Sequence, residues 1–396
     1  MPPMGLHQAI VIGGGIGGLS AALALHRQGI PVTVHERAAS LEPVGAGLAL
    51  APNALRALDR LGVGHRLRAL AAPHPAIGVR HPSGRWLART STAAVEAHFG
   101  DPIAAVPRAD VIAALLDALP EGTVHTDSPA TVIDPGDDRH PAVVRTADGD
   151  RSAGLVVAAD GIRSATRGLL FPGHPGPRYS GFTTWRSIVT PDRRPTAAGE
   201  VWGRGRLAGI VPLADGRVYV YGAALSPAGA RAAAGEHAEL QRLFGDWCAP
   251  VPQLFSLAEP DRLLRNDVWE LADPLPAHHH GRVALLGDAA HAMCPFLGQG
   301  ACQAIEDAVV LASLLGPETA DPAAALPTYS ATRLPRTTAI VTASRRAGAL
   351  IALHSPAATL LRTIALTLAD LLPTRTLLRR SASIYDWRPP APVRGA

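Results

Sequence analysis

The glycine-rich stretch "VIGGGIGGLS" (11–20) decides how the chain begins to fold. It follows a short run rich in β-branched residues (8–12) and opens a segment with helical apolar spacing (16–29). Gly29 ends that segment, and a second β-branched run (31–36) comes directly after it. The order strand, helix, strand predicts a βαβ unit and therefore a parallel sheet.

The glycine spacing in this stretch predicts a site for ADP-ribose. Gly13 would make the tight turn, Gly15 would let the backbone approach a pyrophosphate, and Gly18 would let the helix pack closely on the sheet. The helix N-terminus would supply N–H groups and positive dipole to the phosphates. Glu36 can accept hydrogen bonds from a ribose diol and disfavours a 2′-phosphate. Arg37 could contact the ligand or be solvated, a turn kept only for packing is the alternative, and FAD and NAD both fit.

A second glycine loop lies in "LLGDAAHAMCPFLGQGACQAIEDA" (285–308). Asp288 follows an expected buried strand, at the end where ligands of α/β proteins bind, and could hold sugar-like hydroxyls. Gly298 and Gly300 permit close backbone approach, and the next helix directs its N-terminus at the same place. Such a site suits a transient anion such as reduced flavin. The alternative is that Asp288 caps a helix and the loop is an ordinary connection.

Between the two glycine loops the sequence first predicts a mixture of helices and hairpins and then mainly strands. Residues 37–75 are expected to be helical after a loop, and 76–88 to form a hairpin. A helix is expected over 108–119, and a hairpin leading to a buried strand over 141–161. Residues 180–270 have strand composition, with "EVWGRGRLAGIVPL" (200–213) treated as one segment and one short helix around "GEHAELQRLFGDW". The chain therefore has a dinucleotide-type domain interrupted by a sheet-rich insertion.

Composition excludes several chemistries. The chain has 396 residues and no lysine, so all 37 basic residues are arginine. This excludes a Walker-type phosphate loop, Schiff-base catalysis and a lysine general base. The net charge of +4 is scattered, so we expect no nucleic-acid partner. Three cysteines without a CxxC pattern favour a reducing cytoplasm.

No membrane or metal site is expected. The N-terminal segment has no basic leader, so neither a signal peptide nor a first transmembrane helix is expected. The apolar stretch 356–372 carries Arg362 and Asp370, which favours an amphipathic or buried helix over a position on a membrane surface. The histidines at 278–280 lack acidic or cysteine partners in sequence, and His291 is better suited to a structural hydrogen bond than to general-base work.

Three stretches together resemble the group A FAD-dependent aromatic hydroxylases, which have the para-hydroxybenzoate hydroxylase fold. They are the first glycine loop with Glu36, "ADGIRSATR" (159–167), and Gly287-Asp288 with "PFLGQGACQAIEDA" (295–308). The resemblance covers essentially the whole chain. It is strongest to the branch with zeaxanthin epoxidase, salicylate hydroxylase and urate hydroxylase relatives. Cys302 stands where many relatives have asparagine, so a side-chain contact to the cofactor is in doubt there.

The resemblance implies an α/β fold in which a Rossmann-like FAD-binding domain is interrupted by a β-sheet substrate domain and followed by C-terminal helices. The expected ranges are 1–75, 100–178 and 271–345 for the discontinuous FAD-binding domain, 76–99 and 179–270 for the substrate domain, and 346–396 for the helical segment.

The resemblance also assigns residues. Arg108 would contact the phosphate or ribityl region and Asp288 the ribityl chain, while Pro295, Leu297 and Gly298 would face the flavin ring. The positions expected to bind FAD are Gly13, Gly15, Ile16, Gly17, Gly18, Glu36, Arg37, Gly47, Arg108, Asp160, Asp288, Pro295, Gly298, Gln299, Gly300, Ala301 and Cys302. Arg163 would contact NAD(P)H. Trp185, Arg204, Tyr219 and Tyr221 are candidates for the substrate pocket, and no metal ligand is expected.

The resemblance implies an NAD(P)H-dependent flavoprotein monooxygenase of secondary metabolism. NAD(P)H would reduce the flavin, and oxygen added at C4a would form a hydroperoxide that hydroxylates or epoxidises an aromatic, polyene or polyketide-like molecule. No protein nucleophile is needed. The alternatives are an FAD-dependent dehydrogenase or oxidase without oxygen insertion, and a non-catalytic flavin-binding sensor or sequestering protein. The partners would be substrate, O2 and NADPH or NADH, and the protein would be a monomer or homodimer.

Overall fold

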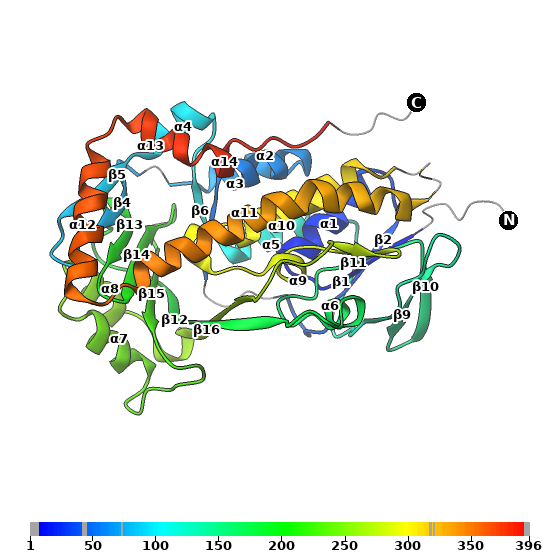
Figure 1. The fold of residues 1–396 in the computed structure, drawn as a ribbon, viewed down its shortest axis with the longest axis horizontal. Helices are drawn as coiled ribbons and strands as arrows, with labels where there is room; N and C mark the ends of the chain where they lie inside the picture. The colour runs from blue at the N-terminus through cyan, green and yellow to red at the C-terminus, as the bar shows by residue number, and fades with distance from the viewer. Residues whose placement is uncertain (1–7, 42–45, 73, 317–318, 320, 392–396) are drawn as a thin grey trace.

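The computed structural model describes residues 8–41, 46–72, 74–316, 319 and 321–391. Two large sheets lie toward opposite ends of the long axis, and one long helix, α11 (Leu326–Ala352), runs from one to the other (Figure 1). The outermost parts of the expected first and last segments, 1–7 and 392–396, lie outside the described residues.

The first sheet grows from the strand that precedes the glycine loop. Its strand order is β17-β18-β11-β1-β2-β7, and every neighbouring pair is parallel except β17 with β18. The strands are β1 (Ala9–Ile12), β2 (Val32–His35), β7 (Val124–His125), β11 (Leu155–Ala158), β17 (His279–His280) and β18 (Val283–Leu285). Strands from both ends of the sequence therefore lie side by side, as a crossover topology requires.

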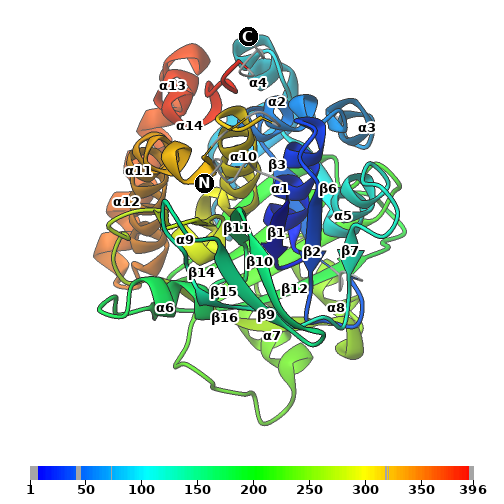
Figure 2. The same cartoon turned by 90° about the vertical axis from the view of Figure 1, so that its right-hand side faces the viewer.

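Each face of this sheet has its own core. Val11 and Val157 pack on one side with α1 (Ile16–Arg27) and α10 (Gly300–Ser313). Ile10 and Val156 point to the other side, as the two-residue period of a strand dictates. That second side is covered by a three-stranded sheet of β8 (Thr131–Asp134), β9 (Ala142–Thr146) and β10 (Gly149–Ala153), with α6 (Ala165–Leu170) and α9 (Asp288–His291). Figure 2 shows β1, β2 and β11 between these two layers.

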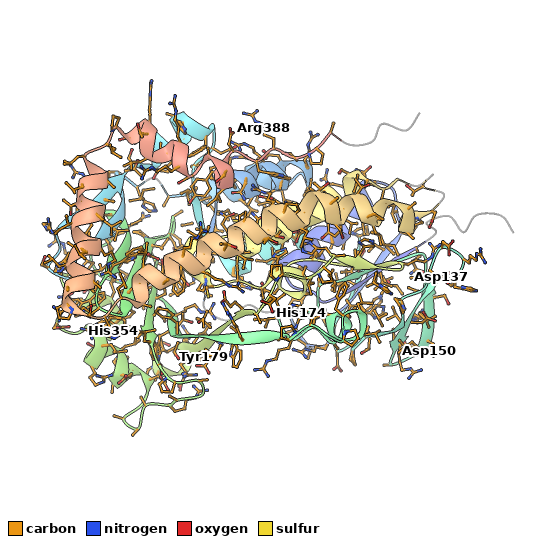
Figure 3. All side chains as sticks on the ribbon, viewed as in Figure 1. Asp137, Asp150, His174, Tyr179, His354 and Arg388 are labelled. Carbon is orange, nitrogen blue, oxygen red and sulfur yellow. The ribbon has the colours of Figure 1, made fainter. Side chains whose placement is uncertain are left out.

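Side chains fill the space between these layers, and Asp137 and Asp150 mark the outer end of the three-stranded sheet in Figure 3. Asp150 is exposed there and pairs with Arg145 on the neighbouring strand at 2.9 Å. His354 lies toward the opposite end of the long axis, close to the second large sheet.

The second sheet has seven strands in the order β16-β12-β15-β14-β13-β4-β5. They are β4 (Ala76–Arg80), β5 (Trp86–Thr90), β12 (Pro177–Val189), β13 (Ala197–Trp202), β14 (Arg206–Pro212), β15 (Val218–Leu225) and β16 (Leu264–Leu271). One face packs on α7 (Glu236–Phe244) and α8 (Val251–Ser256) through Trp185, Phe244 and Trp247. The other face looks toward the first sheet and toward α11.

The remaining elements join and cover the sheets. They are β3 (Gly47–Leu50), β6 (Ala104–Pro107), α2 (Pro52–Arg60), α3 (Gly64–Ala69), α4 (Thr92–Phe99), α5 (Arg108–Leu116), α12 (Pro356–Asp370), α13 (Thr374–Arg380), α14 (Ala382–Tyr385) and the 3₁₀ turns η1 (Pro260–Arg262), η2 (Pro295–Leu297) and η3 (Pro322–Ala325).

Two local expectations were wrong. The segment 47–50 is not helical but forms strand β3, which pairs antiparallel with β6 from a distant part of the chain. The segment 200–213 is not one strand, because it turns at 203–205 between β13 and β14, where Gly205 has φ +63°. For 47–50 the deciding contact is tertiary, since a short apolar run does not distinguish helix from strand by periodicity. The break at 203–205 is local, because β13 and β14 form an antiparallel hairpin around Gly203 and Gly205.

Helices form the C-terminal region, as the sequence predicts. The expected boundary at residue 345 falls inside α11, which continues to Ala352. Helix α12 is amphipathic with the apolar side outward: Leu361 is 68% exposed, whereas Arg362 is buried and donates to the carbonyls of Leu350 and Gly203. Among the described residues no single helix is long and apolar enough to cross a bilayer; α12 and α13 pass that test only as a pair bent by 118°.

Candidate active site

A cavity of about 470 Å³ lies where the carboxyl ends of the first sheet face the second sheet. Ligands of open α/β sheets bind at this position. The backbone-rich end is lined by Gly15, Ile16, Gly17, Ala159, Gly161, Leu286, Gly287, Asp288, Gly298, Gly300, Ala301 and Ala304. The sheet end is lined by Thr184, Arg186, Glu200, Leu207, Val211, Tyr219, Tyr221 and Ala223. Between them lie Ala46, Gly47, Leu48, Ala49, Arg108, Met293, Pro295 and Phe296.

The first glycine loop has three distinct roles in the structure. Gly13 has φ +106°, and a Cβ there would lie 2.3 Å from the carbonyl oxygen of Ala159, so the turn beside β11 requires glycine. A Cβ on Gly18 would lie 1.9 Å from the oxygen of Gly13, so this residue allows close helix packing. A Cβ on Gly15 would have no atom within 4 Å, and Gly15 itself lines the cavity. Gly15 is therefore the position that leaves room for a ligand.

The Glu36 carboxylate is fixed beside this loop. Its Oε2 accepts the N–H of Gly14 at 2.6 Å, and its Oε1 accepts the N–H of Ala38 at 2.8 Å. The residue is half-buried, and lone pairs on both oxygens remain for a ligand hydroxyl. Arg37 next to it is exposed and does not line the cavity.

Arg108 and Asp288 bring opposite charges to the middle of the cavity. Burial raises the pKa of Asp288, while His291 and Arg108 lower it. Burial lowers the pKa of Arg108, with Asp288 opposing that effect and Arg186 adding to it. Asp288 is exposed to the cavity and Arg108 is half-buried, so two opposite charges are available to a ligand that offers both hydroxyls and an anionic group.

The second glycine loop presents backbone rather than side chains to the cavity. Gly298 has φ +62°, and neither Gly298 nor Gly300 has an atom within 4 Å of a Cβ position. The side chains of two expected cofactor residues point into the protein instead. Gln299 is buried and its Oε1 accepts the Nδ2–H of Asn53 at 3.0 Å. Cys302 is fully buried, its thiol contacts the oxygen of Ala49 at 3.5 Å, and burial raises its pKa to about 12.

A buried ionic network supports this loop from behind. Asp307 accepts the backbone N–H of Gly287 at 2.9 Å, His291 Nε2 lies 2.6 Å from the same carboxylate, and Arg333 Nε donates to it at 2.6 Å. Arg333 also donates to Glu306 at 2.6 Å. The two carboxylates and Arg333 are fully buried. Asp307 therefore holds Gly287, the residue before Asp288, in place, and His291 supports Asp307 without lining the cavity.

The middle motif ties two loops together. Ser164 Oγ accepts the N–H of Arg167 at 2.8 Å, and Arg167 donates to the carbonyls of Ala289 at 3.1 Å and Ile162 at 2.7 Å. Asp160 Oδ2 accepts the N–H of Thr166 at 3.2 Å, and its buried Oδ1 has no partner. Asp160 and the exposed Arg163 do not line the cavity, although Gly161 between them does.

At the sheet end, Tyr219 and Tyr221 lie on the cavity face of β15 with ring centroids 5.3 Å apart. Tyr221 donates to Glu200 at 2.7 Å. Arg186 donates to Asn266 at 2.6 Å. Burial raises the pKa of Tyr219 to about 12, with Arg186 opposing it, and raises that of Tyr221 well above its ordinary value.

The structure brings only some of the expected site residues together. Those that line the cavity are Gly15, Ile16, Gly17, Gly47, Arg108, Asp288, Pro295, Gly298, Gly300, Ala301, Tyr219 and Tyr221. Leu297 lies outside the lining. Trp185 points to the opposite face of β12, where its Nε1–H donates to Glu236 at 2.7 Å. Arg204 is exposed in the β13–β14 turn and lines a separate surface groove.

Sequence reasoning missed Glu200 and Arg186, the two charged residues at the sheet end. Their signal was present but weak. Glu200 alternates with Trp202 and so shares a strand face with it, whereas Arg186 directly follows Trp185 and therefore points to the opposite face of its strand. Which face pointed inward depended on the sheet packing. Among the described residues, no group of three or more histidine, cysteine or acidic side chains is arranged to hold a metal ion.

The fold and the cavity define a dinucleotide-binding α/β protein whose ligand site lies between its first sheet and an inserted sheet. Residues 7–344 match the family model described as "FAD binding domain". The chain therefore belongs to the FAD-binding-domain family, in the branch of group A FAD-dependent hydroxylases.

Three comparisons illustrate this membership. The "Aurachin C monooxygenase/isomerase" of Stigmatella aurantiaca is 36% identical over 341 residues, which cover 86% of this chain and 88% of that protein. The "FAD-dependent urate hydroxylase" of Klebsiella pneumoniae subsp. pneumoniae is 35% identical over 345 residues, covering 86% and 89%. The crystal structure of Klebsiella pneumoniae HpxO complexed with FAD and uric acid has a TM-score of 0.85 and 31% identity, covering 95% of each chain.

Proposed function

We propose that this protein is an FAD-dependent monooxygenase that consumes NAD(P)H and O2 and hydroxylates or epoxidises an aromatic, polyene or polyketide-like molecule. The observation that carries the proposal is the single cavity that connects the first glycine loop to the polar face of the inserted sheet. One molecule of FAD can reach from one end toward the other, which leaves the sheet end for a substrate. The named activities of the relatives support the same reaction class.

The residues present fit FAD. Open space at Gly15 accommodates the pyrophosphate, and the free lone pairs of Glu36 suit the ribose diol. Asp288 and Arg108 are placed for the ribityl chain and its phosphate. The start of α10, with Gly298 and its neighbours, offers backbone N–H groups and positive dipole to the ring. Arg37, Leu297, Gln299 and Cys302 contribute at most backbone or supporting contacts in this arrangement.

Bound FAD would supply the redox chemistry, accepting reducing equivalents from NAD(P)H and activating O2. The chain's own contribution is positioning and exclusion of water. The apolar side chains of Leu207, Val211 and Phe296 exclude water from the site, and the positive end of α10 favours an anionic cofactor ring. Arg163 is exposed near the cavity-lining Gly161 and is our candidate for a contact to NAD(P)H.

Domain boundaries and cellular location are also proposals. The assignment of β4, β5 and β12 to β16 to one sheet supports a substrate domain built from 76–99 and 179–270 inside a discontinuous FAD-binding domain. Three free cysteines support a reducing, cytoplasmic location.

A matched pair of glycine variants tests cofactor binding. Gly15→Val places a side chain in open space, so the fold is kept but FAD cannot bind, whereas Gly18→Ala introduces a contact of 1.9 Å with backbone and destabilises the fold itself. FAD affinity would be measured by flavin fluorescence and folding by circular dichroism. A Gly15→Val protein that binds FAD as tightly as the wild type contradicts the proposed site.

Turnover distinguishes the proposal from its alternatives. The holoenzyme is incubated with NADPH or NADH, ¹⁸O2 and a panel of aromatic and polyene compounds. We expect accelerated NAD(P)H oxidation and a product that carries one labelled oxygen atom. Hydrogen peroxide without labelled product for every compound favours an oxidase or dehydrogenase, and bound FAD without NAD(P)H oxidation favours a sensor or sequestering protein.

A further inference from the structure

One row of residues crosses four strands of the second sheet on its cavity face. The register pairs Arg186 on β12 with Tyr221 on β15, Tyr221 with Gly209 on β14, and Gly209 with Glu200 on β13. Directly paired residues point to the same side of a sheet, so the three side chains share the cavity face. Adjacent strands are about 4.8 Å apart, which puts the α-carbons of Arg186 and Glu200 roughly 14 Å apart.

The glycine in this row allows its two polar neighbours to meet. A Cβ on Gly209 would lie 2.0 Å from Cζ of Tyr221, so the tyrosine ring lies directly over the glycine. In that position the Tyr221 hydroxyl reaches across β14 and donates to Oε1 of Glu200 at 2.7 Å. Gly209 therefore determines where Tyr221 lies and which oxygen it contacts.

A second donor fixes the other oxygen of Glu200. Trp202 Nε1–H donates to Oε2 at 2.6 Å. The Trp202 ring is itself held, because it is 9% exposed and the guanidinium of Arg362 lies 5.7 Å from its centroid. The carboxylate thus has one neutral donor on each oxygen and a fixed orientation.

The same carboxylate is incompletely paired. Each carboxylate oxygen can accept two hydrogen bonds, so at least one acceptor site on each oxygen is left after these contacts. No arginine or histidine among the described residues lies within the 4.0 Å ion-pair distance of Glu200. Burial raises the pKa of Glu200, and the bonds from Tyr221 and Trp202 oppose that effect. A half-buried acceptor with free lone pairs that faces a cavity gains from a ligand donor that displaces water.

We propose that Glu200, held by Tyr221 and Trp202, binds a hydrogen-bond donor of the substrate, either a phenolic O–H or a ring N–H on an aromatic molecule. The inference rests on the proposed function and names the substrate class of that site. A substrate carboxylate is rejected at this end by charge repulsion. Arg186 at the other end of the row, with an Nε that has no partner, suits an acceptor or anionic group of the same substrate. Glu200 is thus a specificity-determining residue.

The test compares matched probes on the FAD-loaded holoenzyme by isothermal titration calorimetry. The probes are 2-naphthol, 2-methoxynaphthalene, which lacks the donor, and 2-naphthoate, which carries a carboxylate. We expect the wild type to bind 2-naphthol at least tenfold more tightly than the methyl ether, because a buried acceptor left unpaired is penalised. In Glu200→Gln the preference should fall severalfold and 2-naphthoate should bind severalfold more tightly. Glu200→Leu should abolish the preference.

Tyr221→Phe serves as a matched control, because it keeps the charge on Glu200 and removes only one of its fixing bonds. It should weaken 2-naphthol binding without strengthening 2-naphthoate. A merely structural Glu200 would lower the melting temperature of Glu200→Gln and leave both ratios between probes unchanged, which overturns the inference. The inference is also overturned if the wild type does not bind 2-naphthol more tightly than 2-methoxynaphthalene, or binds neither of them.

The two proposals can fail separately. Calorimetry requires no turnover, so donor preference lost in Glu200→Gln supports the inference even where no labelled oxygen is incorporated. Oxygen incorporation with the donor preference unchanged in both Glu200 variants contradicts the inference and leaves the monooxygenase assignment standing.

Discussion

Two acidic clusters lie near the cavity, one fully buried on α10 and one half-buried on the second sheet, and they differ in how completely they are paired. On α10, Glu306 and Asp307 contact the guanidinium groups of Arg333 and Arg336 and the imidazole of His291, and each of their oxygens accepts at least one hydrogen bond. On the second sheet, Glu200 meets only the neutral donors of its two aromatic neighbours. The two carboxylates of the first cluster are fully buried, whereas Glu200 lines the cavity.

The difference indicates separate roles. A closed network of buried charges fixes the loop that carries Asp288, and it is costly to break because the remaining charges stay buried. An open cluster leaves acceptor capacity that only a ligand can use. Substitutions in the closed cluster should therefore change folding, and substitutions in the open cluster should change ligand choice.

The largest effect is expected from Arg333→Met. It leaves Glu306 and Asp307 buried without their shared cation, so the free energy of unfolding in urea should fall by about 3–5 kcal/mol. Adding Asp307→Asn to this variant removes one of the stranded charges and should recover part of the loss. A fall of less than about 1 kcal/mol would show that the network is not structural.

The next largest effect is expected from low pH, which should reduce the stabilisation that the α10 cluster gives through Asp307. Burial raises the pKa of Asp307, but His291, Arg333 and the hydrogen bond from His291 outweigh it, so the folded-state pKa lies below the ordinary value. The stabilisation is then present above the unfolded pKa near 3.8 and is lost as pH falls through the folded value. The urea stability of the wild type should fall more than that of Asp307→Asn between pH 7 and pH 3, by about 1 kcal/mol.

The pH dependence of stability expected from Glu200 has the opposite sign to that expected from Asp307. Its folded-state pKa is raised, so its contribution to stability is fully present below the unfolded pKa and is lost as pH rises through the folded value. Relative to Glu200→Gln, the wild type should therefore lose stability as pH increases from about 4. Equal pH profiles for Asp307→Asn and Glu200→Gln would contradict the distinction between the clusters.

A smaller effect is expected from Gly209→Ala. The added methyl group displaces the Tyr221 ring, which costs about 1–3 kcal/mol of stability and separates Tyr221 from Glu200. Calorimetry with 2-naphthol should show the weakening seen in Tyr221→Phe. The double variant Gly209→Ala/Tyr221→Ala has no tyrosine ring for the new methyl group to displace. Its free energy of unfolding should therefore be nearly the same as that of Tyr221→Ala alone.

The smallest effect is expected at an exposed ion pair. Arg66 donates to Asp117 at 2.7 Å, but both side chains are about half exposed, so solvent screens the pair. Arg66→Ala should change the free energy of unfolding by less than about 1 kcal/mol and leave probe binding unchanged. A loss comparable to that of Arg333→Met would mean that burial does not explain the first prediction.

Much of the nucleotide end could be predicted from sequence. The turn at Gly13, the open position at Gly15 and the carboxylate of Glu36 all lie within one contiguous strand–helix–strand unit. Asp288 could be placed because it directly follows a buried strand. Such assignments need only short-range geometry, since each role depends on the residue's position relative to neighbours in the chain.

Other assignments failed because they depended on which way a side chain points. Trp185 was expected beside the substrate but faces α7, while its neighbour Arg186 lines the cavity. The side chains of Gln299 and Cys302 turn into the core around α10, so for these two residues a backbone contact to the cofactor stays a prediction. Neighbouring residues of a strand point to opposite faces of the sheet, and the composition of the strand does not indicate which face other elements cover.

The sequence by itself determined a dinucleotide-binding α/β fold, its two glycine loops and a cofactor that contains ADP-ribose, because glycine spacing and strand–helix order are local constraints. The tertiary structure alone decided the composition of the sheet end. Arg186, Gly209, Tyr221 and Glu200 come from four strands, and only the register of those strands places them in one row. Register depends on long-range packing, so the residues proposed to choose the substrate emerge only once the sheet is assembled.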